Sequence, residues 1–187
     1  MCPDGFSFEC EPDPAAFCAE PWARCDVPSD CILAPESGCC FPCGDALALE
    51  DVRAISRHFA EQYYESQCPG ALECPACAPA TNPSLQTTCN AGFCEAIDVR
   101  RLPLSACTSN DECRLRVPDC CECGAEVNPE TLIALNVDQG GAYTPLVCGP
   151  FGDDPGEDPC FPCAAEYPDT LEAYCAADGH CDIRPAS

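Results

Sequence analysis

The cysteines of this chain follow one spacing pattern twice. Each copy carries a Cys-x5-Cys, a vicinal pair with a third cysteine close behind, a gap of 24 residues to the next cysteine, a Cys-x2-Cys and a gap of 11 residues. The spacings agree although most side chains between them differ, which indicates a tandem duplication. The repeated cysteines are Cys25, Cys31, Cys39, Cys40, Cys43, Cys68, Cys74, Cys77, Cys89 and Cys94 in the first copy, and Cys107, Cys113, Cys120, Cys121, Cys123, Cys148, Cys160, Cys163, Cys175 and Cys181 in the second.

This cysteine density predicts a disulfide framework. Cysteine makes up 23 of 187 residues, and each copy is too short to rely on a hydrophobic core alone. We therefore expect an oxidising compartment, either extracellular or at the cell surface. A thiolate protein that binds zinc or copper stays an alternative, because Cys-x2-Cys pairs have ligand-like spacing, although ten cysteines per copy exceed the four ligands of a zinc site. A thioredoxin-like role would need alternating strands and helices around these pairs, and the sequence has no such pattern.

The duplication divides the chain into three parts. Residues 1–18 form an irregular leader with Cys2, Cys10 and Cys18, residues 19–100 the first cysteine-rich module, and residues 101–187 the second. The join has no Gly/Ser linker, so we expect the two modules to abut.

One helix is expected in the first module, between Cys43 and Cys68. Asp45 is a suitable N-cap, and the apolar residues that follow recur every three or four positions, as on one face of a helix. The apolar positions are Leu49, Val52, Ile55, Phe59 and Tyr63.

The second module is expected to start its helix in the same way. Asn128 is a suitable cap and Pro129 a suitable first residue, before the apolar positions 132, 133, 135 and 137. Gly140, Gly141 and Pro145 predict that this helix ends early.

Each module is also expected to end in a β-hairpin. Residues 85–99 carry the turn Asn90-Ala91-Gly92, and residues 171–183 carry Asp178-Gly179. The predicted fold class is a small disulfide-rich protein, a tandem duplication in which each module has one short helix and a C-terminal β-hairpin and is otherwise built of loops.

The charge balance restricts the partners. The chain has 32 acidic residues and 8 basic ones, all arginine, for a net charge of -24. Such a surface repels nucleic acid and anionic membranes, so neither is an expected partner. The absence of lysine, with abundant alanine and proline, indicates a GC-rich and hence bacterial genome.

The N-terminus has no apolar run and no basic segment, so we identify neither a signal peptide nor a membrane span in the given chain. Met1-Cys2 fits a start codon placed before the lipid-bearing cysteine of a bacterial lipoprotein, which makes Cys2 a candidate lipid anchor. The alternative is that Cys2 is a further disulfide partner or a free thiol.

No pattern points to catalysis. The sequence lacks Gly-x-Ser-x-Gly, His-Glu-x-x-His and a phosphate loop, and both His58 and His180 are expected to be lone surface residues. We predict no enzyme, no catalytic residues and no cofactor. An acidic stretch with Asp153, Asp154, Glu157 and Asp158 could hold Ca²⁺, but it matches no EF-hand spacing.

Four aromatic residues are the candidate contact residues. They are expected in loops pinned by cysteines, where rigid rings could form a contact patch; alternatively they fill the small cores beside the bridges. The residues are Trp22, Phe41, Phe151 and Phe161.

The tract from Cys25 to Cys43, CDVPSDCILAPESGCCFPC, and its copy CTSNDECRLRVPDCCEC resemble the whey-acidic-protein four-disulfide core family in their vicinal cysteines and in the acidic residue before the second cysteine. This resemblance implies protease inhibition, an activity of several members. The whole run from Cys-x5-Cys to the final hairpin also resembles uncharacterised cysteine-rich exported proteins of myxobacteria, whose motifs imply no activity.

Together these features predict a secreted or surface-anchored protein that has a binding or structural role without catalysis. The expected partner is a protein or a cell surface. A protease inhibitor, an acidic Ca²⁺-binding protein and a thiolate metal-binding protein stay open as alternatives.

Overall fold

The structure is a computed structural model. Its described residues are 21–44, 46–68, 70, 74, 76–118, 120, 122, 127–149 and 166–186. The predicted leader, the cap residue Asp45, the aromatic residues Phe151 and Phe161, and the acidic stretch around Asp153 lie outside them.

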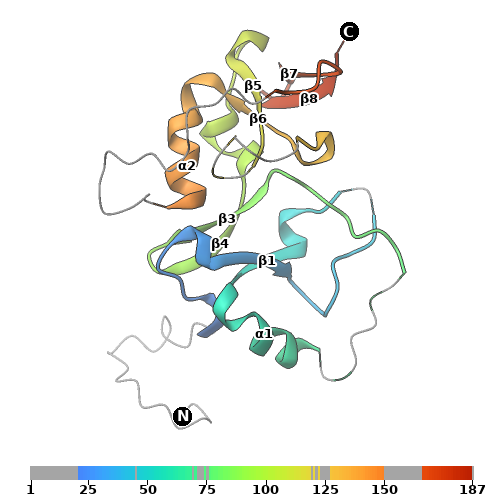
Figure 1. Cartoon of the computed structure of the whole chain (residues 1–187), viewed down its shortest axis with the longest axis vertical. Coiled ribbons are helices and arrows are strands. Elements are labelled where there is room, and N and C mark those ends of the chain that lie inside the picture. The colour runs from blue at the N-terminus through green and yellow to red at the C-terminus, as the bar shows by residue number, and fades with distance from the viewer. Residues whose placement is uncertain are drawn as a thin grey trace.

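The first half contains two antiparallel strand pairs and one helix (Figure 1). Strand β1 (Cys31–Pro35) pairs with β2 (Val52–Ser56), and helix α1 (Ala60–Gln67) follows. Strands β3 (Leu85–Asn90) and β4 (Phe93–Asp98) then form a hairpin. The β1–β2 pair packs against this hairpin.

The second half has the same order of elements. Strand β5 (Cys113–Arg116) pairs with β6 (Ile133–Asn136), and helix α2 (Gly140–Cys148) follows. Strands β7 (Leu171–Cys175) and β8 (Cys181–Pro185) form the last hairpin. The described residues also form short 3-10 turns, η1 (Pro21–Ala23), η2 (Pro28–Asp30), η3 (Leu49–Asp51), η4 (Arg57–Phe59), η5 (Val99–Arg101), η6 (Pro103–Ser105), η7 (Asn110–Glu112), η8 (Pro129–Thr131) and η9 (Val137–Gln139).

The two predicted hairpins are confirmed. In the first, Ala91 and Gly92 have φ angles of 51° and 82°, the left-handed conformation that a tight two-residue loop requires. In the second, Gly179 has a φ of 80°. Glycine adopts this conformation without steric cost, so the turn residues determine where both hairpins reverse.

The helix predicted between Cys43 and Cys68 is wrong over its first part. Residues 52–56 form strand β2, and the α-helix begins only at Ala60. Val52 and Ile55 are buried on opposite faces of β2, and a short strand buried on both faces cannot be told from a buried helix by its periodicity.

The second predicted helix also begins later than expected. Its apolar residues Ile133 and Leu135 lie in strand β6, while Gly140, Gly141 and Pro145, expected to break a helix, all lie within α2. The cap was placed correctly, since the Asn128 side chain accepts a hydrogen bond from the Glu130 backbone, but it caps a short 3-10 turn. Tertiary packing overrides local helix propensity here.

The core is divided into five small clusters of buried side chains among the described residues. Two of them are centred on tyrosines that are 0% exposed, and each tyrosine hydroxyl donates to a backbone carbonyl. Tyr63 bonds the Pro35 carbonyl at 2.7 Å, and Tyr143 bonds the Pro118 carbonyl at 2.6 Å. Clusters this small leave much of the stability to the disulfides.

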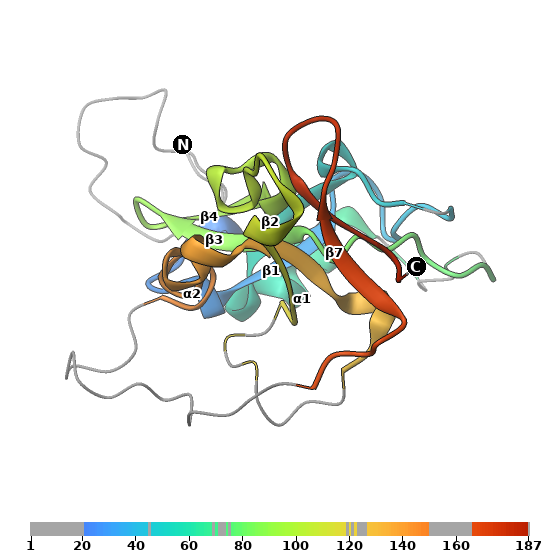
Figure 2. The same cartoon turned by 90° about the horizontal axis from the view of Figure 1, so that it is seen from above.

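The two halves pack directly on each other through α2, which lies along β3 (Figure 2). The Thr88 hydroxyl donates to the Leu146 carbonyl at 2.7 Å. Ile97 packs against the cluster around Tyr143, and Arg100 reaches the Asp178 carboxylate at 3.1 Å. The halves therefore abut, as expected from the short join.

Candidate functional site: the bridged cysteines and the acidic surface

All sixteen cysteines among the described residues are paired, and every bridge stays within its own half. This confirms the expected disulfide scaffold, and among these residues no bridge joins the halves. The remaining cysteines, at 2, 10, 18, 121, 123, 160 and 163, lie outside the described residues. The bridges are Cys25–Cys89, Cys31–Cys94, Cys39–Cys68, Cys40–Cys74, Cys43–Cys77, Cys107–Cys175, Cys113–Cys181 and Cys120–Cys148.

Two bridges fasten the first hairpin to the Cys-x5-Cys loop. Cys89 and Cys94 lie directly opposite each other on β3 and β4, and they bind Cys25 and Cys31, the two ends of that loop. An isolated two-stranded hairpin is only marginally stable, and these two bridges stabilise it.

The second half is fastened in the same way. Cys175 and Cys181 face each other on β7 and β8 and bind Cys107 and Cys113. In each half, three of the four sulfurs lie within 4.8 Å of one another, close enough to share a metal ion, but all belong to disulfides. We call these two pairs of bridges the stacked bridges.

The acidic residue before the second cysteine of each loop is a capping residue. The Asp30 carboxylate accepts hydrogen bonds from the Asp26 and Val27 backbone amides, at 2.9 and 3.1 Å. These bonds, that from Asp26 above all, lower the pKa of Asp30, because they stabilise the charged form.

Glu112 does the same in the second half. It accepts from the Thr108 hydroxyl at 2.6 Å and from the Thr108 backbone amide at 2.8 Å, and these bonds lower the pKa of its carboxyl group. The acidic residue that carries the likeness to the whey-acidic-protein tract therefore has a structural role in this chain. Its position, just before the second cysteine of a short loop, is the signal that could have indicated this role.

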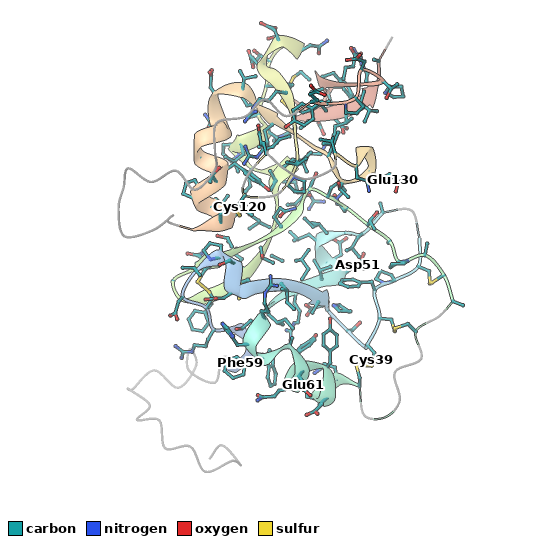
Figure 3. The ribbon with its side chains drawn as sticks, in the orientation of Figure 1. Cys39, Asp51, Phe59, Glu61, Cys120 and Glu130 are labelled. Carbon is teal, nitrogen blue, oxygen red and sulfur yellow. A yellow bond between two sulfur atoms is a disulfide. The ribbon has the colours of Figure 1, made fainter. Side chains whose placement is uncertain are left out.

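The third bridge of each half attaches the segment after β1 or β5 to the end of the helix. Cys39 binds Cys68, and Cys120 binds Cys148 (Figure 3). Cys68 and Cys148 are each 8% exposed.

Two further bridges join the Cys-x2-Cys segments of the first half to each other. Cys40 binds Cys74 and Cys43 binds Cys77, so neither segment closes on itself. A thioredoxin-like site would require a bridge within one Cys-x2-Cys segment. We call this pair of bridges the cysteine ladder.

The surface of the described residues is acidic and nearly free of large exposed apolar side chains. Among the described residues, Val137 is the one large hydrophobic residue that is exposed, at 43%. Between described residues, ion pairs hold six arginines, and the chain as a whole has an excess of carboxylates that makes its electrostatic potential negative. The six are Arg53, Arg100, Arg101, Arg114, Arg116 and Arg184.

Arg116 is a buried charge that sequence reasoning missed. It is 5% exposed, its guanidinium lies 2.6 Å from the Glu122 carboxylate, and it stacks over the Tyr143 ring at 4.6 Å. Arg114 reaches the same carboxylate at 3.0 Å. The alternation of charged and apolar residues along β5 predicts exposed arginines, and only the tertiary structure encloses this one.

His180 is a second residue whose surroundings differ from the prediction. It is half-buried, and its Nδ1 lies 2.9 Å from the Ser105 hydroxyl, which is 0% exposed and also donates to the Arg100 carbonyl at 2.6 Å. When the hydroxyl donates to that carbonyl, the ring nitrogen is the donor in the contact with His180. The pair attaches the last hairpin turn to η6.

Among the candidate contact residues, the structure describes Trp22 and Phe41, and it does not bring them together. Trp22 lies edge-on to Tyr63, with ring centroids 6.0 Å apart. Phe41 packs against a different cluster, the one around Leu47. Both rings are half-buried, so their larger contacts are with the core.

Comparisons of this chain with protein-family models, with curated proteins and with solved structures returned no match. The two resemblances seen in the sequence therefore stay predictions. The dense disulfides indicate a small extracellular or secreted protein of an oxidising compartment. Among the described residues, no helix is long and apolar enough to cross a bilayer.

Proposed function

We propose that this protein is a secreted or surface-anchored binding protein that recognises a basic partner through a rigid acidic surface, without catalysis. The observation that carries the proposal is the charge arrangement. Six arginines are held in intramolecular ion pairs while the chain keeps a net charge of -24. Complementary charge raises the rate of association and selects for partners of opposite sign.

The disulfides support a binding role because they fix the surface before the partner arrives. Both hairpins are attached to their loops at two points, so little chain entropy is lost when they make contact. With so few large apolar side chains exposed among the described residues, contacts there would be mainly polar and charged.

The decisive experiment is capture from the extracellular fraction of the host. The oxidised protein, immobilised at low and at physiological salt, is expected to retain a basic partner whose binding weakens as salt screens the charges. The reduced and alkylated chain has similar charge but no fold, and is the control. Equal capture by both forms would contradict recognition by a folded surface, and turnover abolished by one acidic substitution would contradict the non-enzymatic role.

Acidic substitutions can then assign the surface to one half. Glu61 and Glu65 lie exposed on α1, while Glu130 and Asp138 lie exposed in the second half. Replacing either pair by amides changes the net charge equally, so a difference in capture between the two variants identifies the half that binds.

Protease inhibition is the second candidate. A specific observation favours it: Ala76, Ala78 and Pro79 are exposed beside the cysteine ladder, and Pro79 makes a β-bridge with Cys43. An exposed segment clamped by bridges is a suitable shape for a protease cleft. Inhibition of one member of a protease panel, lost on reduction, would support this role.

Metal binding has less support as a function of the oxidised protein. Every cysteine among the described residues is bridged, which leaves no thiolate there for a metal store while the bridges are closed. The acidic stretch considered for Ca²⁺ lies outside the described residues.

We also infer that the two halves arose by duplication. Three bridges of the first half have a counterpart at the same place in the second, and the helices and strands follow in the same order.

A further inference from the structure

The stacked bridges of the first half place two disulfides within exchange distance of each other. The Cys25 sulfur, which is bridged to Cys89, lies within 4.8 Å of both sulfurs of the Cys31–Cys94 bridge. Thiol–disulfide exchange needs a thiolate that can reach one sulfur of a disulfide. Side-chain rotation can close a gap of this size, so a Cys25 thiolate, once released, has a second disulfide within its reach.

The Cys-x5-Cys loop has contacts with the hairpin at both of its ends that do not depend on the Cys25–Cys89 bridge. At one end, the Cys25 amide donates to the Gly92 carbonyl at 3.1 Å. At the other end, the Thr87 hydroxyl donates to the Cys31 carbonyl at 3.2 Å, and β1, which begins at Cys31, contacts β3 (Figure 1). These contacts keep the Cys25 sulfur near the second bridge when its own bridge opens.

A buried hydroxyl group beside Cys31 has no partner among the described residues. Ser56, on β2, is 1% exposed and lies directly opposite Cys31, which is 5% exposed. Its hydroxyl oxygen makes no hydrogen bond there. Residues directly opposite on paired strands have Cβ atoms about 5 Å apart, on one face of the sheet. A buried hydroxyl without a partner is costly, and one beside a sulfur can donate to that sulfur once it is a thiolate.

We propose that the stacked bridges of the first half are a site that takes up a low-molecular-weight thiol at Cys89. The thiol opens the Cys25–Cys89 bridge, and Cys25 then exchanges into the neighbouring bridge and binds Cys94. Cys31 is released as a thiolate, to which the Ser56 hydroxyl donates. The new Cys25–Cys94 bridge keeps the loop attached to the hairpin. This site is independent of the proposed recognition of a basic partner.

The two steps balance without an oxidant or a reductant. In the first, the thiolate of the added thiol attacks the Cys89 sulfur, forms a mixed disulfide and releases the Cys25 thiolate. In the second, Cys25 attacks the Cys94 sulfur, forms the Cys25–Cys94 bond and breaks the Cys31–Cys94 bond. Two disulfides and one thiol are present before and after the reaction. The proton that the added thiol loses is available to the Cys31 thiolate.

The second step would make the adduct persist. In a bridge without a neighbour, the released thiolate attacks the mixed disulfide, expels the added thiol and restores the bridge. Here Cys25 is taken up by Cys94, and the remaining thiolate is on Cys31, at 5% exposure. A hydrogen bond from Ser56 makes Cys31 the better leaving group of the two bridged sulfurs, because a stabilised thiolate leaves faster.

The second half repeats the sulfur geometry without the free hydroxyl. Three of its stacked sulfurs also lie within 4.8 Å of one another. The residue opposite Cys113 is Asn136, whose side-chain amide is occupied on both sides. Its Nδ2 donates to the Ala106 carbonyl at 2.8 Å, and its Oδ1 accepts from the Asp138 amide at 2.9 Å. We therefore expect the first half, and not the second, to retain the thiol.

The test incubates the oxidised full chain with glutathione alone, removes the free glutathione and then alkylates the remaining thiols. Peptide mapping without reduction locates each bond. We expect glutathione on Cys89, a bridge between Cys25 and Cys94, and a thiol on Cys31 that is alkylated only after denaturation. The near-UV circular dichroism should stay native, which separates this exchange from scrambling in an unfolded chain.

Ser56→Ala tests the hydroxyl. It should lower the ratio of the Cys25–Cys94 bridge to the original bridge by about tenfold, because a hydrogen bond to a charged group is lost. Ser66→Ala, at an exposed serine of α1, is the matched control and should leave that ratio unchanged. Cys89→Ala gives a check without added thiol, since the freed Cys25 should then be found bridged to Cys94.

Three outcomes would overturn the proposal. The first is glutathione retained on Cys89 with Cys25 left as the free thiol. The second is full return of the original bridges once glutathione is removed, and the third is a ratio that Ser56→Ala does not change. If Cys89→Ala fails to fold, the map of the unaltered chain decides. None of these outcomes affects capture of a partner by the oxidised protein, so this proposal can fail while the proposed function stands.

Discussion

The last turns of α1 and α2 lie at equivalent places in their halves, but the first carries polar side chains and the second apolar ones. Counted back from the bridged cysteines at 68 and 148, Ser66 and Gln67 correspond to Leu146 and Val147. The first pair is exposed to solvent, whereas the second pair is half-buried against the cluster that joins the halves. The equivalent turn thus faces solvent in the first half and an interface in the second.

The two hairpins also differ in what their side chains contact. Thr88 and Ile97 of the first hairpin contact the second half. At the equivalent places of the second hairpin stand Tyr174 and Arg184, and Arg184 lies over the Tyr174 ring at 4.5 Å and pairs with Glu172 at 2.6 Å. This outer face satisfies its own polar groups.

The first prediction tests whether bridges stabilise both halves. Complete reduction in the absence of added metal should unfold both, because each lost bridge costs about 2–5 kcal/mol in a small domain and the core clusters are small. The near-UV circular dichroism of the reduced chain should be lost, while the oxidised chain should resist heating. One half that kept native signals when reduced would show that its core is sufficient.

The second prediction concerns the interface between the halves. Leu146→Ala should lower the free energy of unfolding by about 1–3 kcal/mol, because it removes half-buried apolar contacts with the cluster that joins the halves. Ser66→Ala at the equivalent place in α1 should change it by less than about 0.5 kcal/mol, since that side chain is exposed. Denaturant unfolding of both variants measures the difference, and equal effects would contradict the assignment of the two faces.

The third prediction compares two arginine–glutamate pairs that each lie beside a core tyrosine. Arg116 is 6% exposed in its side chain and pairs with Glu122, whereas Arg53 is 30% exposed and pairs with Glu36. Glu122→Gln should therefore cost about 1–3 kcal/mol, because it removes the negative charge of a carboxylate that pairs with a buried guanidinium.

Glu36→Gln is the matched control and should cost less than about 1 kcal/mol, because water screens an exposed pair. High salt should reduce this smaller effect further. Equal costs in denaturant unfolding would show that burial does not distinguish the two pairs.

The fourth and smallest effect is a loss of stability in acid that comes from Asp30 and Glu112, the acidic residues that cap the two Cys-x5-Cys loops. The pKa values of Asp30 and Glu112 are lowered in the folded state by hydrogen bonds that require the charged form. Their contribution to stability is therefore complete above the carboxyl pKa of the unfolded chain, about 4, and is lost as the pH falls through the lower folded values.

Asp30→Asn and Glu112→Gln should each flatten the loss of stability below about pH 4, since an amide does not titrate. Acid titrations followed by circular dichroism measure this slope. A slope unchanged in both variants would show that the caps do not contribute to acid unfolding.

Local sequence was sufficient for some of the fold. The cysteine spacing indicated a disulfide scaffold, and the turns at Gly92 and Gly179 indicated both hairpins, because glycine at a positive φ acts within a few residues. Each half also has one short helix, as expected, but in each half the helix starts later than expected, after a strand. The β1–β2 and β5–β6 pairs were missed because residues 36–51 and 117–132 separate the strands, and no local pattern reports such pairing.

The site shows the same division. The sequence by itself determined the cysteine pattern and the acid excess, since spacing and charge are local properties. Only the tertiary structure decided that the segment Cys40–Cys43 is bridged to the segment Cys74–Cys77. The same holds for the burial of Arg116 beside Glu122 and for the contact between His180 and Ser105. Each of these depends on segments far apart in the chain, whose approach is set by packing and by the need to pair buried polar groups.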